Sequence, residues 1–264
     1  MLSNFFKAKP VVDETTREWI FDTFVWCIAE LDGEFFQQNS ELILPSNTFY
    51  PGSASCVEEM AETIFTKTIQ YSGMTSWPIK LVPSTNFTQK PMSQLFFETR
   101  LRGVNCKLVN KETISSIDIA FHPSQLNQPQ DLIAYLVQTL AHVLVSQNGR
   151  LPSRNEAVLA QTIDLVACFM GFGVIFANTA YQFKGGCGSC NNRNLNRQAA
   201  LPELETVYVL ALFSVIKGGD MKKVKRELKS HLYKPFRQAH KEITQYLQNT
   251  ANLEHVLLTA NFSR

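Results

Sequence analysis

The chain has no long uninterrupted hydrophobic run. Its longest apolar stretch, 165–177, is thirteen residues, whereas a helix that crosses a bilayer needs about twenty. Residues 1–10 also lack the apolar core of about seven or more residues that a signal peptide carries. We therefore expect 165–177 to be a buried core helix and the protein to be cytoplasmic, with no membrane partner.

Strong charge imbalance, internal repeats and low-complexity tracts are also missing. The 264 residues include 25 Lys and Arg against 23 Asp and Glu, and 45% of the chain is apolar. A chain of this length and composition can bury a large core. Because no linker-like segment divides it, we expect one compact domain over 1–264, with an α/β part over about 11–125 and a helical part over about 129–250.

Cysteine is sparse, with six residues in the chain. Without a secretion signal, these are expected to be free thiols, metal ligands or redox groups rather than a disulfide framework. Four of them occur among apolar residues and are expected to behave as small core residues: Cys27, Cys56, Cys106 and Cys168.

Hydrophobic periodicity predicts a chain rich in helices. Apolar residues recur at helical spacing over 13–31, where Asp13 is the expected N-cap. Pro129 starts another helix, which Gly149 and Pro152 end. The other helices are predicted over 55–71, 153–182, 201–217, 221–232 and 235–250.

Short runs of β-prone residues occupy much of the first half of the chain. They cover 41–44, 79–82, 94–99, 104–109 and 116–121, and turn-forming Pro, Gly and Asn residues separate those beyond residue 79. We expect the runs between 79 and 121 to form one small, mainly antiparallel sheet. The predicted fold class is therefore α+β with a helical carboxy-terminal half.

One helical segment carries a motif with catalytic spacing. Gln138-Thr139-Leu140-Ala141-His142 has the spacing of H-E-x-x-H. In that motif two histidines four apart share a helical face and bind Zn²⁺, while the glutamate activates the metal-bound water. Here Gln138 stands at the first ligand position and Thr139 at the position of the base. Glutamine is a poor zinc ligand and threonine cannot act as the general base.

The order of elements around this motif resembles the core of the zincin metallopeptidases. A predicted strand, 116–121, precedes the helix that carries His142, and the next helix bears the acidic Asp164. The sequence is also similar to that of an uncharacterised bacterial family whose better-equipped members carry H-E-L-x-H and then E-x-x-T-D-L. On that register Ala160 occupies the place of the third-ligand glutamate. The runs 140–144, 163–165 and 169–173 carry the similarity, which covers most of the chain and is most specific in 132–178 and 185–216. It implies zincin-like core helices and a degenerate site, Gln138, Thr139, His142 and Asp164, without catalytic residues.

Two isolated polar residues are expected to pair. The segment 132–145 is apolar nearly all round except for Gln138, Thr139 and His142, so we expect this helix to be buried. Asp164 is an isolated charge in the next helix, and a buried carboxylate is costly unless it is paired. We expect His142 and Asp164 to bond directly or through one water. The alternative is that His142 is a core histidine with other partners.

A second motif is the C-G-S-C run with Cys187 and Cys190. C-x-x-C is the form of a zinc knuckle and also of a dithiol redox pair. A structural zinc site needs four ligands, and the chain has no second C-x-x-C or C-x-x-H. The open assignments are a zinc site completed by Cys106, by a histidine or across a dimer, a local disulfide, and two free thiols in a loop. No other cofactor is expected.

Basic residues concentrate in 217–241. Nine Lys and Arg occur there against Asp220 and Glu227, a local net charge of +7 in a chain of +2. Such a segment can bind nucleic acid or an acidic partner. A solvated face is the more usual outcome, and no nucleic-acid motif or aromatic interleaving accompanies the charges, so nucleic acid is not the expected partner.

Three functional hypotheses follow from these features. The leading one is a non-catalytic relative of a zincin metallopeptidase that acts as a binding or regulatory protein, with a protein partner or a second copy of itself. The alternative is a metal-binding or thiol-redox protein that uses Cys187 and Cys190. The third is binding of nucleic acid or an acidic partner through 217–241. No substrate or pathway follows from the residues.

Overall fold

The computed structural model describes residues 9–52, 55–109, 115–153, 156–180 and 197–249. Helices account for 62% of the structure. The α-helices are α1 (Glu14–Glu30), α2 (Gly33–Asn39), α3 (Val57–Ser72), α4 (Pro129–Asn148), α5 (Leu159–Ala167), α6 (Gly173–Thr179), α7 (Glu203–Lys217), α8 (Met221–Glu227) and α9 (Ser230–Gln248). The strands are β1 (Ile79–Pro83) and β2 (Ile117–Phe121), and η5 (Cys168–Phe172) is a π-helical stretch.

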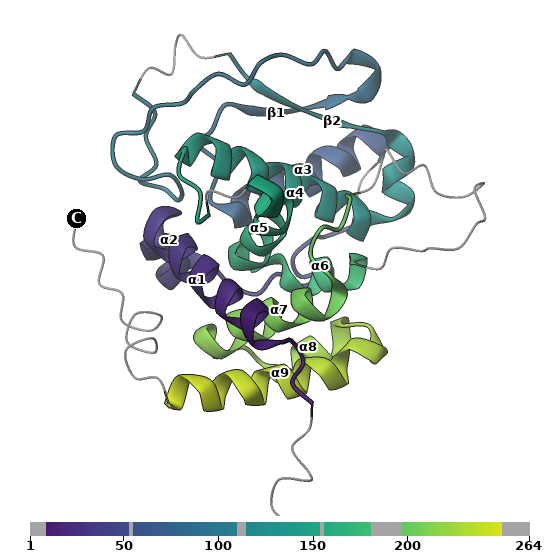
Figure 1. Cartoon of the computed structure of the whole chain (residues 1–264). Coiled ribbons are helices and arrows are strands. Elements are labelled where there is room, and N and C mark those ends of the chain that lie inside the picture. The colour runs from purple at the N-terminus through teal and green to yellow at the C-terminus, as the bar shows by residue number, and fades with distance from the viewer. Residues whose placement is uncertain (1–8, 53–54, 110–114, 154–155, 181–196, 250–264) are drawn as a thin grey trace, which may run out of the picture.

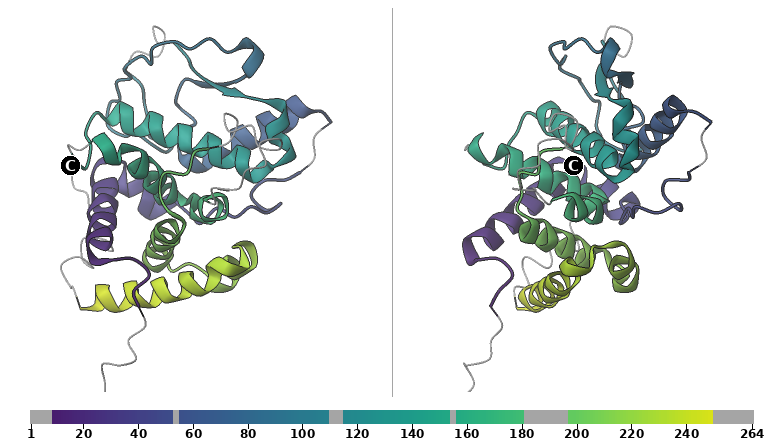
Figure 2. Two further views of the ribbon diagram at one scale, coloured as in Figure 1. Left: turned by 45° about the vertical axis from the view of Figure 1, so that its right-hand side comes forward. Right: turned by 90° about the vertical axis from the view of Figure 1, so that its right-hand side faces the viewer.

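The elements are layered between the strand pair at one end and α9 at the other (Figure 1). The strands lie over α3 and α4, and α4 in turn packs on α5 and α6. α7 contacts α6 on one side and α9 on the other, so that α9 forms the outer edge of the helical part (Figure 2).

Four phenylalanine rings join the amino-terminal helices to the carboxy-terminal ones. Phe36 stacks on Phe169 with ring centroids 4.7 Å apart, and Phe24 meets Phe169 edge-on at 5.3 Å. Phe213 of α7 meets Phe36 edge-on at 5.7 Å. All four side chains are fully buried, so α1, α2, η5 and α7 share one core. Aromatic pairs of this geometry stabilise beyond the area that they bury.

The predicted antiparallel sheet is wrong. The described residues contain two strands, and these pair in parallel, with Ile79 opposite Ile117 and Pro83 opposite Phe121. A parallel pair needs a long crossover, which the connection 84–116 supplies instead of a tight turn. The fold class is therefore mostly helical rather than α+β with an antiparallel sheet.

Three of the predicted strands are not formed. Residues 41–44 are irregular, and 94–99 and 104–109 meet in a single antiparallel bridge between Phe97 and Leu108. In 94–99 and 104–109 several β-prone side chains are exposed, with Phe96 at 61% and Val104 at 94%, whereas Ile43 and Leu44 are buried without pairing to a strand. β-propensity reflects fit to a pleated surface, so a β-prone run does not form a strand unless a neighbouring strand pairs with it.

The predicted helix 153–182 is interrupted. Gly171 has φ +103° between α5 and α6, and its carbonyl accepts a hydrogen bond from Ile43 N at 2.9 Å. A Cβ at this position would collide with the Glu41 carbonyl oxygen. Residues 156–179 are long and apolar enough to cross a membrane by composition, but 72% of the most apolar window is buried inside the fold, as expected of a core helix.

Local signals set the ends of several helices, and two others end elsewhere than predicted. Asp13 caps α1 by accepting from Thr16 N at 2.8 Å, as predicted, and Gly149 is the left-handed C-cap of α4. α8 ends at Glu227 rather than near 232, and α9 begins at Ser230 rather than at Pro235. Pro235 therefore lies inside α9 rather than at its start. Because proline has no amide N–H, the helix lacks the backbone hydrogen bond from this position to the residue four places earlier.

Candidate functional site

The helix that carries the degenerate motif has one polar face rather than a fully buried surface. Tyr135, Gln138 and Thr139 are half-buried, and His142 is exposed. The opposite face of α4 packs into the core through Leu136, Leu140 and other buried residues. The prediction that α4 is buried all round is wrong, because its polar side chains follow one helical face that the core does not cover.

Asp164 is the best-connected polar residue near this face. It is fully buried on α5, and its carboxylate accepts four hydrogen bonds from described residues. Gln138 Nε2 donates to Oδ1 at 2.7 Å, and Arg197 Nη1 donates to Oδ2 at 3.1 Å. The backbone amides of Ala200 and Leu201 donate to Oδ2 at 2.8 and 3.0 Å. We call this group, Asp164, Gln138, Arg197 and the amides of 200–201, the Asp164 cluster.

The structure shows no direct hydrogen bond between the described residues His142 and Asp164, so the direct form of the predicted pairing is wrong, and the form through one water stays a prediction. Gln138, one helical turn earlier, supplies the donor from α4, and His142 is exposed to solvent. The two positions lie on the same face of α4 but about 6 Å apart along its axis. Because α5 crosses α4 at the level of Gln138, the carboxylate meets that residue, and His142 is not one of the described donors to it.

Arg197 ties the cluster to α6. Its Nε donates to Thr179 Oγ1 at 2.9 Å and its Nη2 donates to the Phe176 carbonyl at 2.8 Å. The guanidinium carbon also lies 4.2 Å from the centroid of the Phe176 ring. With the bond to Asp164, each of its three nitrogens has a partner, so the buried charge is both compensated and hydrogen-bonded, as such pairs require.

Two side chains of the degenerate motif, Gln138 and Thr139, make hydrogen bonds within the fold. Gln138 Nε2 donates to the Gln198 carbonyl at 3.0 Å as well as to Asp164, so it links α4, α5 and the segment that follows residue 196. Thr139 Oγ1 donates to the Tyr135 carbonyl at 2.9 Å within its own helix. Ala160, at the place of the third ligand, is exposed and offers no ligand atom.

Burial shapes the ionisation of the groups around Asp164. It lowers the pKa of Arg197, while the Asp164 carboxylate acts in the opposite direction. Burial also raises the pKa of the Cys168 thiol far above its ordinary value, and the nearby Asp164 charge adds to this. A thiol held in its protonated form is a weak nucleophile and a weak metal ligand, so Cys168 is a core residue, as predicted.

Metal-binding groups are not assembled in the part of the chain that the structure describes. No three His, Cys, Asp or Glu side chains gather there in a group that could hold a metal ion. Cys187 and Cys190, predicted as a metal or dithiol pair, lie outside the described residues. Cys27 and Cys106 are buried as predicted, whereas Cys56 is exposed and its sulfur caps α3 by accepting from Glu59 N at 3.5 Å.

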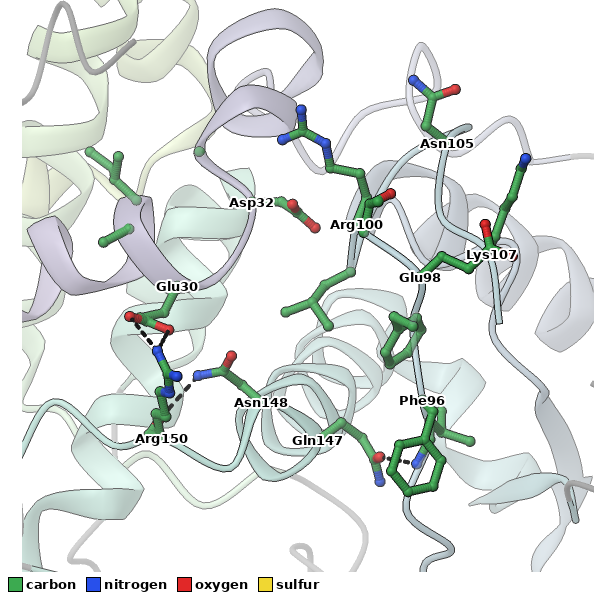
Figure 3. Close-up of a pocket in the computed structure, with 17 residues that line it drawn as sticks. Glu30, Asp32, Phe96, Glu98, Arg100, Asn105, Lys107, Gln147, Asn148 and Arg150 are labelled. Carbon is green, nitrogen blue, oxygen red and sulfur yellow. Dashed lines mark hydrogen bonds and ion pairs between the residues drawn. The ribbon is translucent and has the colours of Figure 1, made fainter. Parts of the chain in front are cut away.

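A separate pocket lies between α1, the end of α4 and the connection between the strands (Figure 3). Its volume is about 990 Å³, and both signs of charge line it. Arg150 pairs with Glu30 at 3.3 Å, and Arg100 pairs with Glu34 outside the lining. Gln147 is held by the Leu95 amide at 2.6 Å. Much of the polar lining is therefore already paired, so the pocket favours no one class of ligand.

Asp32 at the edge of this pocket has an unusual backbone. Its φ is +61°, the one positive φ among described residues other than glycine. The carboxylate accepts from Arg102 N at 2.5 Å, and burial raises the pKa of Asp32. Arg102 is buried, its Nε donates to the Leu31 carbonyl at 3.0 Å, and its guanidinium lies over the rings of Phe35 and Phe169. Burial lowers the pKa of Arg102 to about 10.

Sequence reasoning missed Arg197, Arg102 and the pocket. Arg197 lies 33 positions after Asp164, in a run of polar residues that is typical of a surface loop. Arg102 follows a β-prone run in which nothing marks burial of a charge. The one available signal was the isolated Asp164, which required a buried partner and left its identity open.

Comparison with known proteins gives no match: no protein-family model, no curated protein and no solved structure matches this chain.

Proposed function

We propose that this chain is a non-catalytic relative of the zincin metallopeptidases and that it acts as a binding or regulatory protein. The observation that carries the proposal is the bonding of Gln138. Its amide donates to Asp164 Oδ1 at 2.7 Å and to the Gln198 carbonyl at 3.0 Å. The position that would present a zinc ligand in H-E-x-x-H therefore serves as a cross-link between three segments.

Two further positions support the loss of catalysis. The Thr139 hydroxyl donates to its own helix, and Ala160 has no donor atom. A catalytic zinc site needs three protein ligands and an open coordination position. His142 alone provides one ligand, and the buried carboxylate on the next helix, Asp164, is paired with Arg197.

The order of elements supports the relationship to zincins. β2 leads to α4 with the Q-T-x-x-H run, and α5 with Asp164 packs against α4. This is the order that the resemblance implies. On this proposal the fold keeps the two helices of a zinc site, while the Asp164 cluster replaces the metal as the link between them.

The first experiment measures zinc and hydrolysis in tag-free protein. We expect no chelator-sensitive cleavage of a peptide library. Cleavage that a chelator abolishes and that disappears in His142→Ala would show an active peptidase. Zinc that is lost in Cys187→Ser/Cys190→Ser, with no hydrolysis, would favour the alternative function of the C-G-S-C loop.

The second experiment tests the relationship to zincins by restoring the motif. The triple variant Gln138→His/Thr139→Glu/Ala160→Glu supplies the missing ligands and base, with His142 in place. We expect added Zn²⁺ to raise its thermal midpoint, since a ligand that binds the folded state stabilises it. The control is Gln138→His alone, which loses the same amide bonds without completing the ligand set. Equal zinc responses in both variants would contradict the relationship.

A further inference from the structure

The outer face of α8 and α9 is strongly basic. Eight cations lie there and all are exposed: Lys222, Lys223, Lys225, Arg226, Lys229, Lys234, Arg237 and Lys241. We call these residues the α8–α9 basic face. The ninth cation of the basic segment, Lys217, is not part of it, because its Nζ donates to the carbonyls of Phe36 and Gln37 at 2.7 and 2.8 Å.

The cations of α9 are separated from its apolar residues. Lys234, Arg237 and Lys241 follow each other at spacings of three and four, which places them on one side of the helix. The buried residues Leu232, Phe236, Ala239, Ile243 and Leu247 follow the opposite side and pack toward α7. α9 lies along an edge of the molecule (Figure 1). Because its apolar side packs into the core, its basic side is exposed to solvent.

Few carboxylates compensate this charge. Asp220 caps α8 by accepting from Lys222 N at 2.8 Å, and Glu227 pairs with Arg226 at 2.7 Å. Glu242 on α9 accepts from Gln238 and from the Val11 amide, and Asp131 interacts electrostatically with Lys229. Among the described residues these carboxylates are fewer than the eight cations, so the face keeps a net positive charge, and a surface potential of this sign attracts anionic partners.

The composition of the face distinguishes among anionic partners. None of the exposed large apolar side chains of the described residues belongs to α8 or α9. A membrane-surface helix inserts an apolar face and a protein interface is centred on apolar or aromatic anchors, so this face fits neither. Single-stranded nucleic acid is bound largely by exposed aromatic rings on which bases stack, and Tyr233 is half-buried beneath Lys225.

Against the expectation from the sequence that nucleic acid is not a partner, we propose that the α8–α9 basic face binds the phosphate backbone of double-stranded nucleic acid without reading its sequence. This mode of binding needs neither a sequence-reading motif nor exposed aromatic rings. Six of the eight cations are lysines, which act as mobile point charges, whereas sequence readout in the major groove relies mainly on bidentate arginine contacts. Lys234 and Lys241 are about 10 Å apart along α9, a span that covers about three phosphates of one strand at about 3.4 Å of duplex axis each. This proposal does not depend on the α4 site.

The test is titration of a fluorescent 20-base-pair duplex of mixed sequence with the full chain at several salt concentrations. Each phosphate contact adds about 0.9 to the slope of log affinity against log salt. We expect Lys234→Gln/Arg237→Gln/Lys241→Gln to lower the slope by about one per lost contact, hence by about three. Affinity at about 50 mM salt should fall by about tenfold or more, equally for duplexes of different sequence.

The matched control removes three cations from the opposite end of the molecule. Lys80→Gln/Lys90→Gln/Lys107→Gln changes net charge by the same amount at exposed positions in β1 and in the connection between the strands. We expect it to keep the salt slope of the unchanged chain. Thermal melts of both variants establish that they fold. Equal losses in the two variants, tighter binding to a single strand or to vesicles of anionic lipid, or no duplex binding at about 50 mM salt would each overturn the proposal.

Discussion

Arg197 Nη1 lies 3.1 Å from Asp164 Oδ2, and the two side chains are 2% and 1% exposed. Through this buried ion pair and the bonds of Arg197 to Phe176 and Thr179, the residues before α7 are connected to α5 and α6. The pair is stable in the interior because both groups are fully hydrogen-bonded. The carboxylate has four donors, and each nitrogen of the guanidinium has an acceptor. Removing one partner leaves a buried charge that the rest of the fold cannot solvate.

The first prediction concerns this pair. Asp164→Ala should lower the free energy of unfolding by about 3–5 kcal/mol, because Arg197 is left buried without its counter-ion. The single variants Asp164→Leu and Arg197→Met complete a cycle with the double variant Asp164→Leu/Arg197→Met. The double variant should lose much less than the sum of these two single losses, since both charges are removed together. Denaturant titration of the unchanged chain and these three variants measures the coupling. Additive losses, or an unchanged midpoint in Asp164→Ala, would contradict the structure.

The second prediction separates the two polar residues of the degenerate motif. Gln138→Ala should cost about 1–3 kcal/mol, because Asp164 Oδ1 and the Gln198 carbonyl lose their shared donor. His142→Ala should change stability by less than about 0.5 kcal/mol, since His142 is exposed. Both variants remove one polar side chain from α4, so each is a control for the other. A larger loss for His142→Ala would restore the pairing predicted from the sequence.

The contrast between these residues shows what the sequence could and could not specify. That Asp164 needs a buried partner follows from desolvation of a lone carboxylate. Whether the partner is at 138 or 142 depends on where α5 crosses α4, which is a property of packing. The cation that neutralises Asp164 comes from Arg197, and no local pattern connects two residues 33 positions apart.

For the fold as well, features that depend on nearby residues could be predicted, and features that depend on packing could not. Ends of helices that depend on nearby residues, such as Asp13 before α1 and Gly149 after α4, were predicted correctly because capping is local. The direction of strand pairing was not predicted correctly. β1 and β2 are far apart in the sequence, and no local pattern sets how they pair. α2, a short helix after Asp32, has no long apolar period and was missed.

The third prediction concerns Gly171, which interrupts the apolar stretch between α5 and α6. Gly171→Ala should cost about 3 kcal/mol or more, because its φ of +103° disfavours a side chain and the Cβ would meet the Glu41 carbonyl. Gly149→Ala is the matched control. It also has a positive φ, of +70°, but its Cβ would meet nothing within 4 Å, so about 1 kcal/mol is expected. Thermal or denaturant unfolding compares the two, and equal losses would show that the contact with Glu41 is unimportant.

The fourth prediction concerns the pH dependence of stability and arises from Asp32. Burial raises the pKa of this carboxyl above its ordinary value of 3.8. The folded protein therefore holds the proton more tightly than the unfolded chain does. The stability that this proton contributes is fully present below pH 3.8 and is lost as the pH rises through the raised pKa of the folded state.

Asp32→Asn should remove the loss of stability that ionisation of Asp32 causes at neutral pH. The amide cannot ionise, its oxygen can still accept from Arg102 N, and asparagine tolerates the left-handed backbone. We expect the variant to be more stable than the unchanged chain at pH 7 and the difference to vanish at about pH 2.5, more than one unit below the ordinary pKa of 3.8, where the aspartate is protonated in both states. Asp22→Asn, at an exposed position of α1, controls for net charge. Denaturant titrations across this range decide the matter: a difference that does not change with pH, or a less stable variant at pH 7, would mean that the folded state favours the charged form of Asp32.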